Sequence, residues 1–171
     1  MIKFSDILRE AKQVGPLYHF TSYGRMILIV KDNFVLKPKI LTSESDYLSF
    51  TRNKQMISDS VPSNVRITVD GDKLSEKYKI EPYADTKAGY GRNAWDESEE
   101  RISMIRYPKG VDISNMIKSI DILDIMASLE KDGYGGEDWD EETEPASLRH
   151  YGMLIKLLKE KNIPYNIVKK Y

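Results

Sequence analysis

Extended segments outnumber helical ones along this chain of 171 residues, and helices do not separate them at regular intervals. The clearest is residues 65–70, VRITVD, where apolar and polar side chains alternate as in a strand with one solvated face. Further strands are predicted at residues 17–20, 34–36, 47–52, 79–83, 101–106, 120–126 and 165–170. Because the regular βαβ alternation of parallel sheets is missing, the sequence predicts an α+β fold with a mixed sheet.

Helices are predicted at three places within this pattern of strands. The strongest covers residues 147–161, where apolar side chains recur at helical spacing. Another runs over residues 23–33, with Thr21 or Ser22 as its N-cap. A shorter helical piece is expected over residues 72–78. These helices would flank the sheet.

Residues 1–14 are set apart from the rest of the chain. They read as a short amphipathic helix that Ser5 can cap, and Gly15-Pro16 breaks the chain after it. The segment lacks the apolar stretch of a secretory signal peptide. The length and the 40% apolar content suit one core. Residues 15–171 are therefore expected to form a single domain, with residues 1–14 as an appendage.

The composition excludes several kinds of chemistry. The chain has no Cys, which removes disulfide scaffolds, Cys-ligated zinc and thiol nucleophiles. It has only 2 His residues, so a His-rich metal centre is not expected either. The motifs of phosphate-binding loops and of dinucleotide-binding Rossmann folds are also missing. The sequence therefore predicts no metal site.

Charge and hydropathy constrain the partners. Lys plus Arg number 26 and Asp plus Glu 27, so the chain lacks the basic excess that usually marks a nucleic-acid-binding protein. No apolar run approaches the roughly 20 residues that span a bilayer, so no membrane partner is expected. The acidic residues 133–144 read as a solvated excursion, because their spacing fits no calcium loop.

Three short segments can carry chemistry. The first is YHFTS at residues 18–22, which places a histidine on a strand that runs into a helix N-terminus. The second is SFTR at residues 49–52, where two hydroxyls share one strand face and a cation follows. The third is DESEE at residues 96–100, where Glu97 and Glu99 share a face as the chain enters a strand.

Each segment also has a purely structural interpretation. A histidine at a strand end can simply be a structural hydrogen-bonding group. Alternating hydroxyls can simply form the polar face of a strand, and an acidic run can simply be a solvated loop. Taken together, the order and the spacing of the three segments favour function.

In this order the segments resemble the ADP-ribosyltransferase fold family, including its diphtheria-toxin-like branch and its phage and toxin–antitoxin relatives. That family shows an Arg or a His on its first core strand, then a hydroxyl-bearing motif, then a catalytic Glu, often as Glu-x-Glu. Here YHFTS, YLSFTRN and Glu97-Ser98-Glu99 stand in those places, and the resemblance covers residues 15–126. It implies a mixed, split β-sheet core with flanking helices, and NAD as the substrate.

The resemblance implies a role for each matching residue. Glu99 would be the catalytic glutamate, whose carboxylate stabilises the oxocarbenium-like ribose formed when the nicotinamide–ribose bond breaks. Glu97 would activate or position the acceptor. The NAD pocket would be built from His19, Thr21, Ser49, Thr51 and Arg52. In it His19 would hydrogen-bond the ribose or the nicotinamide amide, and Arg52 would meet the pyrophosphate.

Three assignments stay open at this point. A shift of one residue in register exchanges the faces of Glu99 and Glu100, so Glu100 competes for the catalytic role. A histidine on the first strand combined with Glu-x-Glu mixes two branches of the family, which leaves the acceptor undecided. Tyr23 and Tyr47 are candidates for stacking on nicotinamide, and packing within the core is the alternative role for either tyrosine.

The N-terminus carries a separate resemblance. Large contractile-tailed phages mark internal head proteins with a short N-terminal helix, which the head protease removes after Leu/Ile-x-Glu. Leu8-Arg9-Glu10 followed by Ala11 has that form. It implies a protein packaged in the virion head and injected into the host cytoplasm. A plain docking helix is the alternative.

The sequence thus predicts a phage-encoded, toxin-like, NAD-dependent mono-ADP-ribosyltransferase that modifies a host protein or nucleic acid. The alternative is a catalytically inactive protein of the same fold that acts as a binding or virion-associated component. A nuclease or nucleotide hydrolase has less support, because the chain shows no paired-carboxylate metal site.

Overall fold

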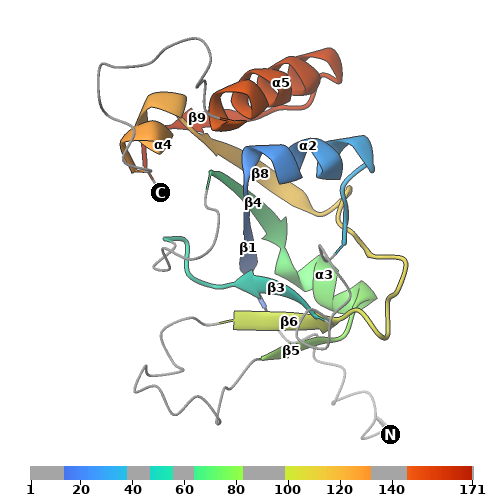
Figure 1. Ribbon diagram of the computed structural model, residues 1–171. Coiled ribbons are helices and arrows are strands. Elements are labelled where there is room, and N and C mark those ends of the chain that lie inside the picture. Colours follow the sequence, from blue (N-terminus) through green and yellow to red (C-terminus); the bar gives the residue numbers. More distant parts are fainter. Residues whose placement is uncertain (1–13, 38–46, 56–63, 83–98, 132–145, 171) are drawn as a thin grey trace, which may run out of the picture.

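The computed structural model describes residues 14–37, 47–55, 64–82, 99–131 and 146–170 (Figure 1). In chain order their elements are β1 Pro16–Thr21, α2 Tyr23–Lys31, β2 Val35–Leu36, β3 Tyr47–Thr51, β4 Val65–Asp70, α3 Gly71–Lys77, β5 Ile80–Pro82, β6 Glu99–Ser103, β7 Val111–Asp112, β8 Ile117–Leu123, α4 Ile125–Lys131, α5 Ala146–Glu160 and β9 Asn166–Val168. The predictions made for the N-terminal helix, the cleavage site after Glu10 and the acidic excursion at 133–144 lie outside these residues.

The strands form a seven-stranded sheet in the order β5-β6-β3-β1-β4-β8-β9. Every neighbouring pair in it is antiparallel except β8 and β9, which run parallel. The short strands β2 and β7 pair separately, Val35 with Asp112 and Leu36 with Val111. The predicted α+β class with a mixed sheet is therefore confirmed.

The large sheet divides between β1 and β3. The described register pairs these two strands at one position, where Tyr18 lies opposite Thr51. In contrast, β1 pairs with β4 along its whole length, from Pro16–Asp70 to Thr21–Val65. Pairing in the continuous sheet is thus sparsest between the strands β5-β6-β3, which we call one half, and the strands β1-β4-β8-β9, the other half. We call the line where they meet the seam.

One face of the larger half carries the hydrophobic core. Val65, Ile67 and Val69 alternate along β4 and are fully buried. Residues directly opposite each other in antiparallel strands share a face, which adds Ile120 and Ile122 of β8 to the same surface. Apolar side chains of α2 and α5 belong to the same core cluster. This packing fixes β1, because β4 is its neighbour in the sheet.

The two longest helices lie side by side and run in the same direction (Figure 1). Near their N-terminal ends the rings of Tyr23 and Tyr151 meet edge to face, with centroids 5.3 Å apart. Near their C-terminal ends the Nζ atom of Lys161 lies 3.5 Å from the carbonyl oxygen of Val30. Of the two N-caps proposed for α2, the structure selects Ser22, whose Oγ accepts from the backbone N–H of Arg25.

The strand over residues 65–70 is confirmed, but its expected solvated face is not. Arg66 is 6% exposed and forms an ion pair with Asp121 on the neighbouring strand, at 2.8 Å. Asn166 of β9 donates to the other oxygen of that carboxylate, and Arg66 also donates to the carbonyl of Lys54. A polar residue on an alternating strand is thus buried here because partners distant in sequence satisfy it.

The predicted strand over residues 120–126 runs too far toward the C-terminus. β8 ends at Leu123 and α4 begins at Ile125. The cause is Asp124, whose carboxylate accepts from the backbone N–H of Met126 at 3.0 Å, in the manner of an N-cap. The predicted strand over 101–106 is likewise shifted, since β6 spans Glu99–Ser103 and a turn bond joins the N–H of Tyr107 to the carbonyl of Ser103.

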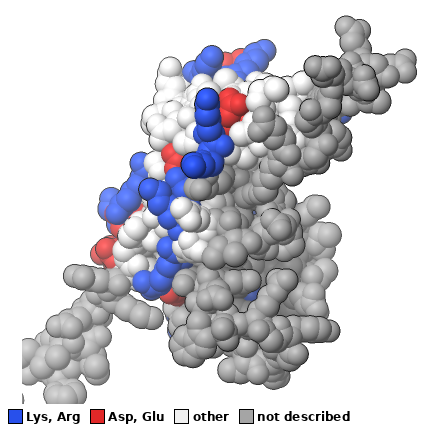
Figure 2. Space-filling view, turned by 90° about the vertical axis from the view of Figure 1, so that its left-hand side faces the viewer, with Lys and Arg blue, Asp and Glu red and all other residues white. Residues whose placement is uncertain are grey.

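Lys and Arg side chains of the described residues run from top to bottom along one side of the molecule in Figure 2, with fewer Asp and Glu side chains among them.

Candidate functional site

His19 lies on β1 beside the seam and reaches across it. Its Nδ1 atom is 3.1 Å from the backbone carbonyl oxygen of Ser49 on β3. Its ring also contacts that of Phe50, with centroids 5.6 Å apart. The first two segments singled out in the sequence, 30 residues apart, therefore meet directly.

The chemical state of His19 follows from these surroundings. Burial lowers the pKa of its imidazole below the usual 6.5, the Ser49 carbonyl acts in the opposite direction, and the positive charge of Arg25 lowers the pKa further. The ring is therefore neutral near pH 7. A carbonyl oxygen can only accept, so the single ring proton sits on Nδ1. The Nε2 atom is then a hydrogen-bond acceptor.

The hydroxyl-bearing segment lies on β3, next to the acidic one on β6. Thr51 lies directly opposite Glu99 in the register, and Ser49 lies directly opposite Arg101. These four residues share one face of the sheet. The Oγ1 atom of Thr51 accepts from the backbone N–H of Asn53 at 3.0 Å, which orients the hydroxyl.

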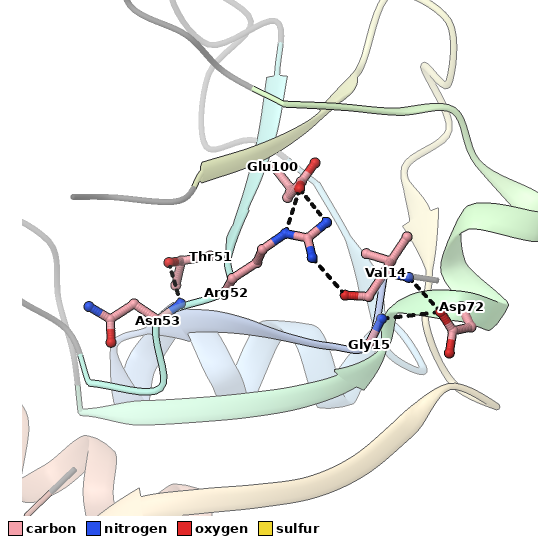
Figure 3. A network of polar contacts seen from close by, with 7 residues as sticks. All are labelled: Val14, Gly15, Thr51, Arg52, Asn53, Asp72 and Glu100. Carbon is pink, nitrogen blue, oxygen red and sulfur yellow. Dashed lines mark hydrogen bonds and ion pairs between the residues drawn. The ribbon is translucent and has the colours of Figure 1, made fainter. Parts of the chain in front are cut away.

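Arg52 and Glu100 form a polar network beside this face (Figure 3). The Nε and Nη2 atoms of Arg52 lie 2.8 and 2.7 Å from one carboxylate oxygen of Glu100. The Nη1 atom donates to the carbonyl of Val14 at 3.0 Å. Asp72 of α3 extends the network, because its carboxylate accepts from the backbone N–H groups of Val14 and Gly15. Arg52 thereby ties β3 to β6 and to the chain that enters β1.

The two adjacent glutamates of β6 have different surroundings. Glu100 is 4% exposed and lies opposite Phe50, on the core side of its half of the sheet. Glu99 lies opposite Thr51, on the other side. The guanidinium assigned to the NAD pyrophosphate is thus engaged with Glu100, whereas Glu99 adjoins the hydroxyl-bearing face.

The remaining predicted site residues lie elsewhere. Thr21 is 5% exposed at the end of β1, opposite Val65, and shares its face with His19. Glu97 lies outside the described residues. His19 and Thr21 therefore lie on the face that carries the core, together with Phe50 and Glu100, and His19 reaches only the backbone carbonyl of Ser49. The register places Ser49, Thr51 and Glu99 on the opposite face.

Two cations near the site were not singled out in the sequence. Arg25 lies in the first turns of α2, acts electrostatically on His19, and donates to the carbonyl of Lys37 at 2.7 Å. Arg101 lies beside Ser49, and its guanidinium carbon is 5.6 Å from the centroid of the Tyr47 ring. The period-two rule pointed to Arg101, since it stands two residues after Glu99 on a strand.

Two general features concern metals and membranes. The described residues contain no group of three or more His, Asp or Glu side chains placed to hold a metal ion. None of their helices is both long enough and apolar enough to cross a bilayer.

Comparison with known proteins adds no further assignment. No protein-family model matches the chain. No curated protein matches it either. The interpretation of the site therefore depends on its own residues and their geometry.

Proposed function

We propose that the chain is an NAD-dependent mono-ADP-ribosyltransferase that modifies a host macromolecule. The observation that carries the proposal is the contact of His19 with Ser49 across the seam. The first two segments that resemble the family lie on β1 and β3, and Glu99 of the third begins β6; these strands are consecutive neighbours in the sheet although they are far apart in sequence. A split sheet with these segments beside the division supports the same core type.

The proposed reaction starts at the glycosidic bond between nicotinamide and ribose. The bond breaks with its electron pair leaving on the nicotinamide nitrogen, and positive charge develops on the ribose. The carboxylate of Glu99 would stabilise that charge and accept from the ribose 2′-hydroxyl. A nucleophile of the acceptor then bonds to the ribose carbon, and Glu97 would take its proton. The products are free nicotinamide and the ADP-ribosylated acceptor.

His19 would hold the dinucleotide in the orientation that this step needs. Its neutral imidazole leaves Nε2 as an acceptor, and a ribose hydroxyl is a matching donor. The hydroxyls of Ser49 and Thr51 share a face with Glu99 and would orient it, whereas Thr21 lies on the same face as His19. Such fixed hydrogen-bonding groups lower the cost of reaching the transition state.

Arg52 would contribute mainly as a positioning residue. Its contacts with Glu100 and Val14 fix the start of β6, which carries Glu99. The side chain is 40% exposed, but all three guanidinium nitrogens are engaged with Glu100 and Val14.

The decisive experiment incubates the protein with labelled NAD and a host lysate. The wild type should transfer label to a macromolecule, and Glu99→Gln should lose nearly all transfer, because an amide cannot supply the negative charge. Glu100→Asp, which keeps a carboxylate for Arg52, is the matched control and should retain transfer. Equal labelling by the wild type and Glu99→Gln would refute the assignment.

A catalytically inactive binding protein of the same fold is the second candidate. The observation in its favour is that Arg52 and Glu100 neutralise each other, which removes a free cation from the predicted pocket. A measurement of thermal stability with and without NAD separates the two. A bound dinucleotide raises the melting temperature. No shift near millimolar NAD would favour the inactive protein.

A further inference from the structure

An arginine lies close to His19 on the helix that follows its strand. β1 leads directly into α2 (Figure 1). Ser22 caps this helix, and its hydroxyl accepts from the backbone N–H of Arg25 at 3.2 Å. Apolar side chains of α2 pack in the core, which lies on the same face of the sheet as His19. Burial is the main cause of the lowered pKa of His19, and the positive charge of Arg25 lowers that pKa further, so the two side chains lie within electrostatic range.

The second observation is that the guanidinium of Arg25 has a neutral partner. Its Nη2 atom donates to the backbone carbonyl oxygen of Lys37 at 2.7 Å, in an exposed contact. Among the residues that the structure describes, no carboxylate lies within ion-pair distance of Arg25. Arg52 differs in this respect, because Glu100 balances its charge. Arg25 therefore offers a positive charge to an anionic ligand, and a guanidinium suits the oxygens of a phosphate.

The two neighbouring groups match two neighbouring parts of a dinucleotide. The Nε2 atom of His19 is an acceptor, for which a ribose hydroxyl is the matching donor. In NAD one CH2 group joins each ribose ring to the diphosphate, so the protein groups that bind a ribose and its phosphate must be neighbours.

We infer that Arg25 donates to the diphosphate of NAD while His19 accepts from the adjoining ribose. The inference rests on the proposed function, and it names the cation of that site. The sequence assigned this role to Arg52, whose guanidinium nitrogens are engaged with Glu100 and Val14. Arg25 is thus a binding residue, and the alternative is a structural role in which it only holds the carbonyl of Lys37.

The test measures the binding of three ligands to the full chain by isothermal titration calorimetry, with no acceptor present. NAD and ADP carry a diphosphate, whereas adenosine carries the same base and ribose without a phosphate. Arg25→Gln should weaken the binding of NAD and ADP by about 10- to 150-fold, the range for losing a hydrogen bond to a charged group. The binding of adenosine should not change, because adenosine presents nothing to the guanidinium.

Matched variants separate the charge from the geometry. Arg25→Lys keeps the charge but loses the planar guanidinium, so it should weaken the binding of ADP by a smaller factor than Arg25→Gln. Lys31→Gln removes an exposed cation from the last turn of the same helix and should bind both diphosphates like the wild type. The melting temperature without ligand should be similar for all these proteins, since Gln and Lys can still donate to the Lys37 carbonyl.

Three results would overturn the inference. They are a wild type that binds neither diphosphate near millimolar concentration, binding of NAD by Arg25→Gln as tight as by the wild type, and equal losses for ADP and adenosine. The last result would assign Arg25 a structural role. The transfer assay distinguishes this inference from the proposed function. Binding of ADP that depends on Arg25, without any transfer of label, would contradict only the enzymatic proposal, whereas transfer that Arg25→Gln leaves intact would contradict only this inference.

Discussion

Arg52 holds one carboxylate oxygen of Glu100 with two nitrogens at once, Nε at 2.8 Å and Nη2 at 2.7 Å. Glu100 is almost fully buried, and Arg52 has no other described carboxylate within ion-pair distance. The stabilising effect of each residue depends on the other, because removing either Arg52 or Glu100 would leave the charge of its partner without an opposite charge. The adjacent Glu99 lies opposite Thr51 in the register, on the other face of the sheet.

Substitution of the two glutamates should therefore separate stability from catalysis. Glu100→Gln should lower the free energy of unfolding by about 1–3 kcal/mol, the range for losing hydrogen bonds to a charged group. Glu99→Gln should change it by less than about 0.5 kcal/mol. Urea unfolding followed by circular dichroism measures both. Equal stabilities of the two variants would show that the network in Figure 3 contributes little.

The stability of the protein should fall as the pH drops below 6.5. Burial is the main cause of the lowered pKa of His19 in the folded state. The unfolded chain therefore takes up the proton at a higher pH than the folded chain does. The contribution of neutral His19 to the free energy of unfolding is complete above pH 6.5 and is lost as the pH falls toward the pKa of His19 in the folded state. His19→Asn, which can keep a donor for Ser49, should flatten this part of the pH profile. His150→Asn, which replaces the other histidine, should leave it unchanged.

Two glycines should respond to alanine in opposite ways. A Cβ on Gly71 would clash with the backbone oxygen of Gly15, and a backbone atom cannot move aside easily, so Gly71→Ala should cost about 1–3 kcal/mol. A Cβ on Gly152 would meet nothing within 4 Å on an exposed helix position. Gly152→Ala should therefore stabilise by about 0.5–1 kcal/mol. Thermal unfolding of both variants measures these effects. A lower melting temperature of Gly152→Ala than of the wild type would contradict the prediction.

The buried ion pair of Arg66 and Asp121 should behave as a unit. Both residues are less than a tenth exposed, and Tyr18 packs against the guanidinium at 5.7 Å. Asp121→Asn should lower the free energy of unfolding by about 3–5 kcal/mol, because it strands a buried positive charge. The double variant Arg66→Met/Asp121→Leu should be less destabilised than Asp121→Asn. Additive losses in a double-mutant cycle would argue against this coupling.

The features predicted correctly from sequence are those set by near neighbours. β1, α2 and α5 follow from apolar spacing and from a cap such as Ser22, all of which lie within a few residues. The start of α4 was missed because a single carboxylate, Asp124, outweighs an apolar run that suits a strand. The cause is again local, but the hydropathy pattern does not show that the Asp124 cap outweighs the apolar run.

Features set by distant partners could not be predicted. The burial of Arg66 depends on Asp121, 55 residues away, and the engagement of Arg52 depends on Glu100, 48 residues away. The sequence predicted the three candidate segments of the site, but it could not show which face of the sheet each of their side chains occupies. Only the register shows that Glu99 joins Thr51 while Glu100 turns toward the core.

The seam also has a mechanical consequence. A sheet resists bending along the line between two strands through the backbone pairs that cross that line. Between β1 and β3 the described register supplies only Tyr18–Thr51, so this line is the softest one on either side of β1. Two side-chain bonds, His19 to Ser49 and Arg52 to Val14, fasten it. A molecule that separates the two halves must break these side-chain bonds, and it contacts both halves at once.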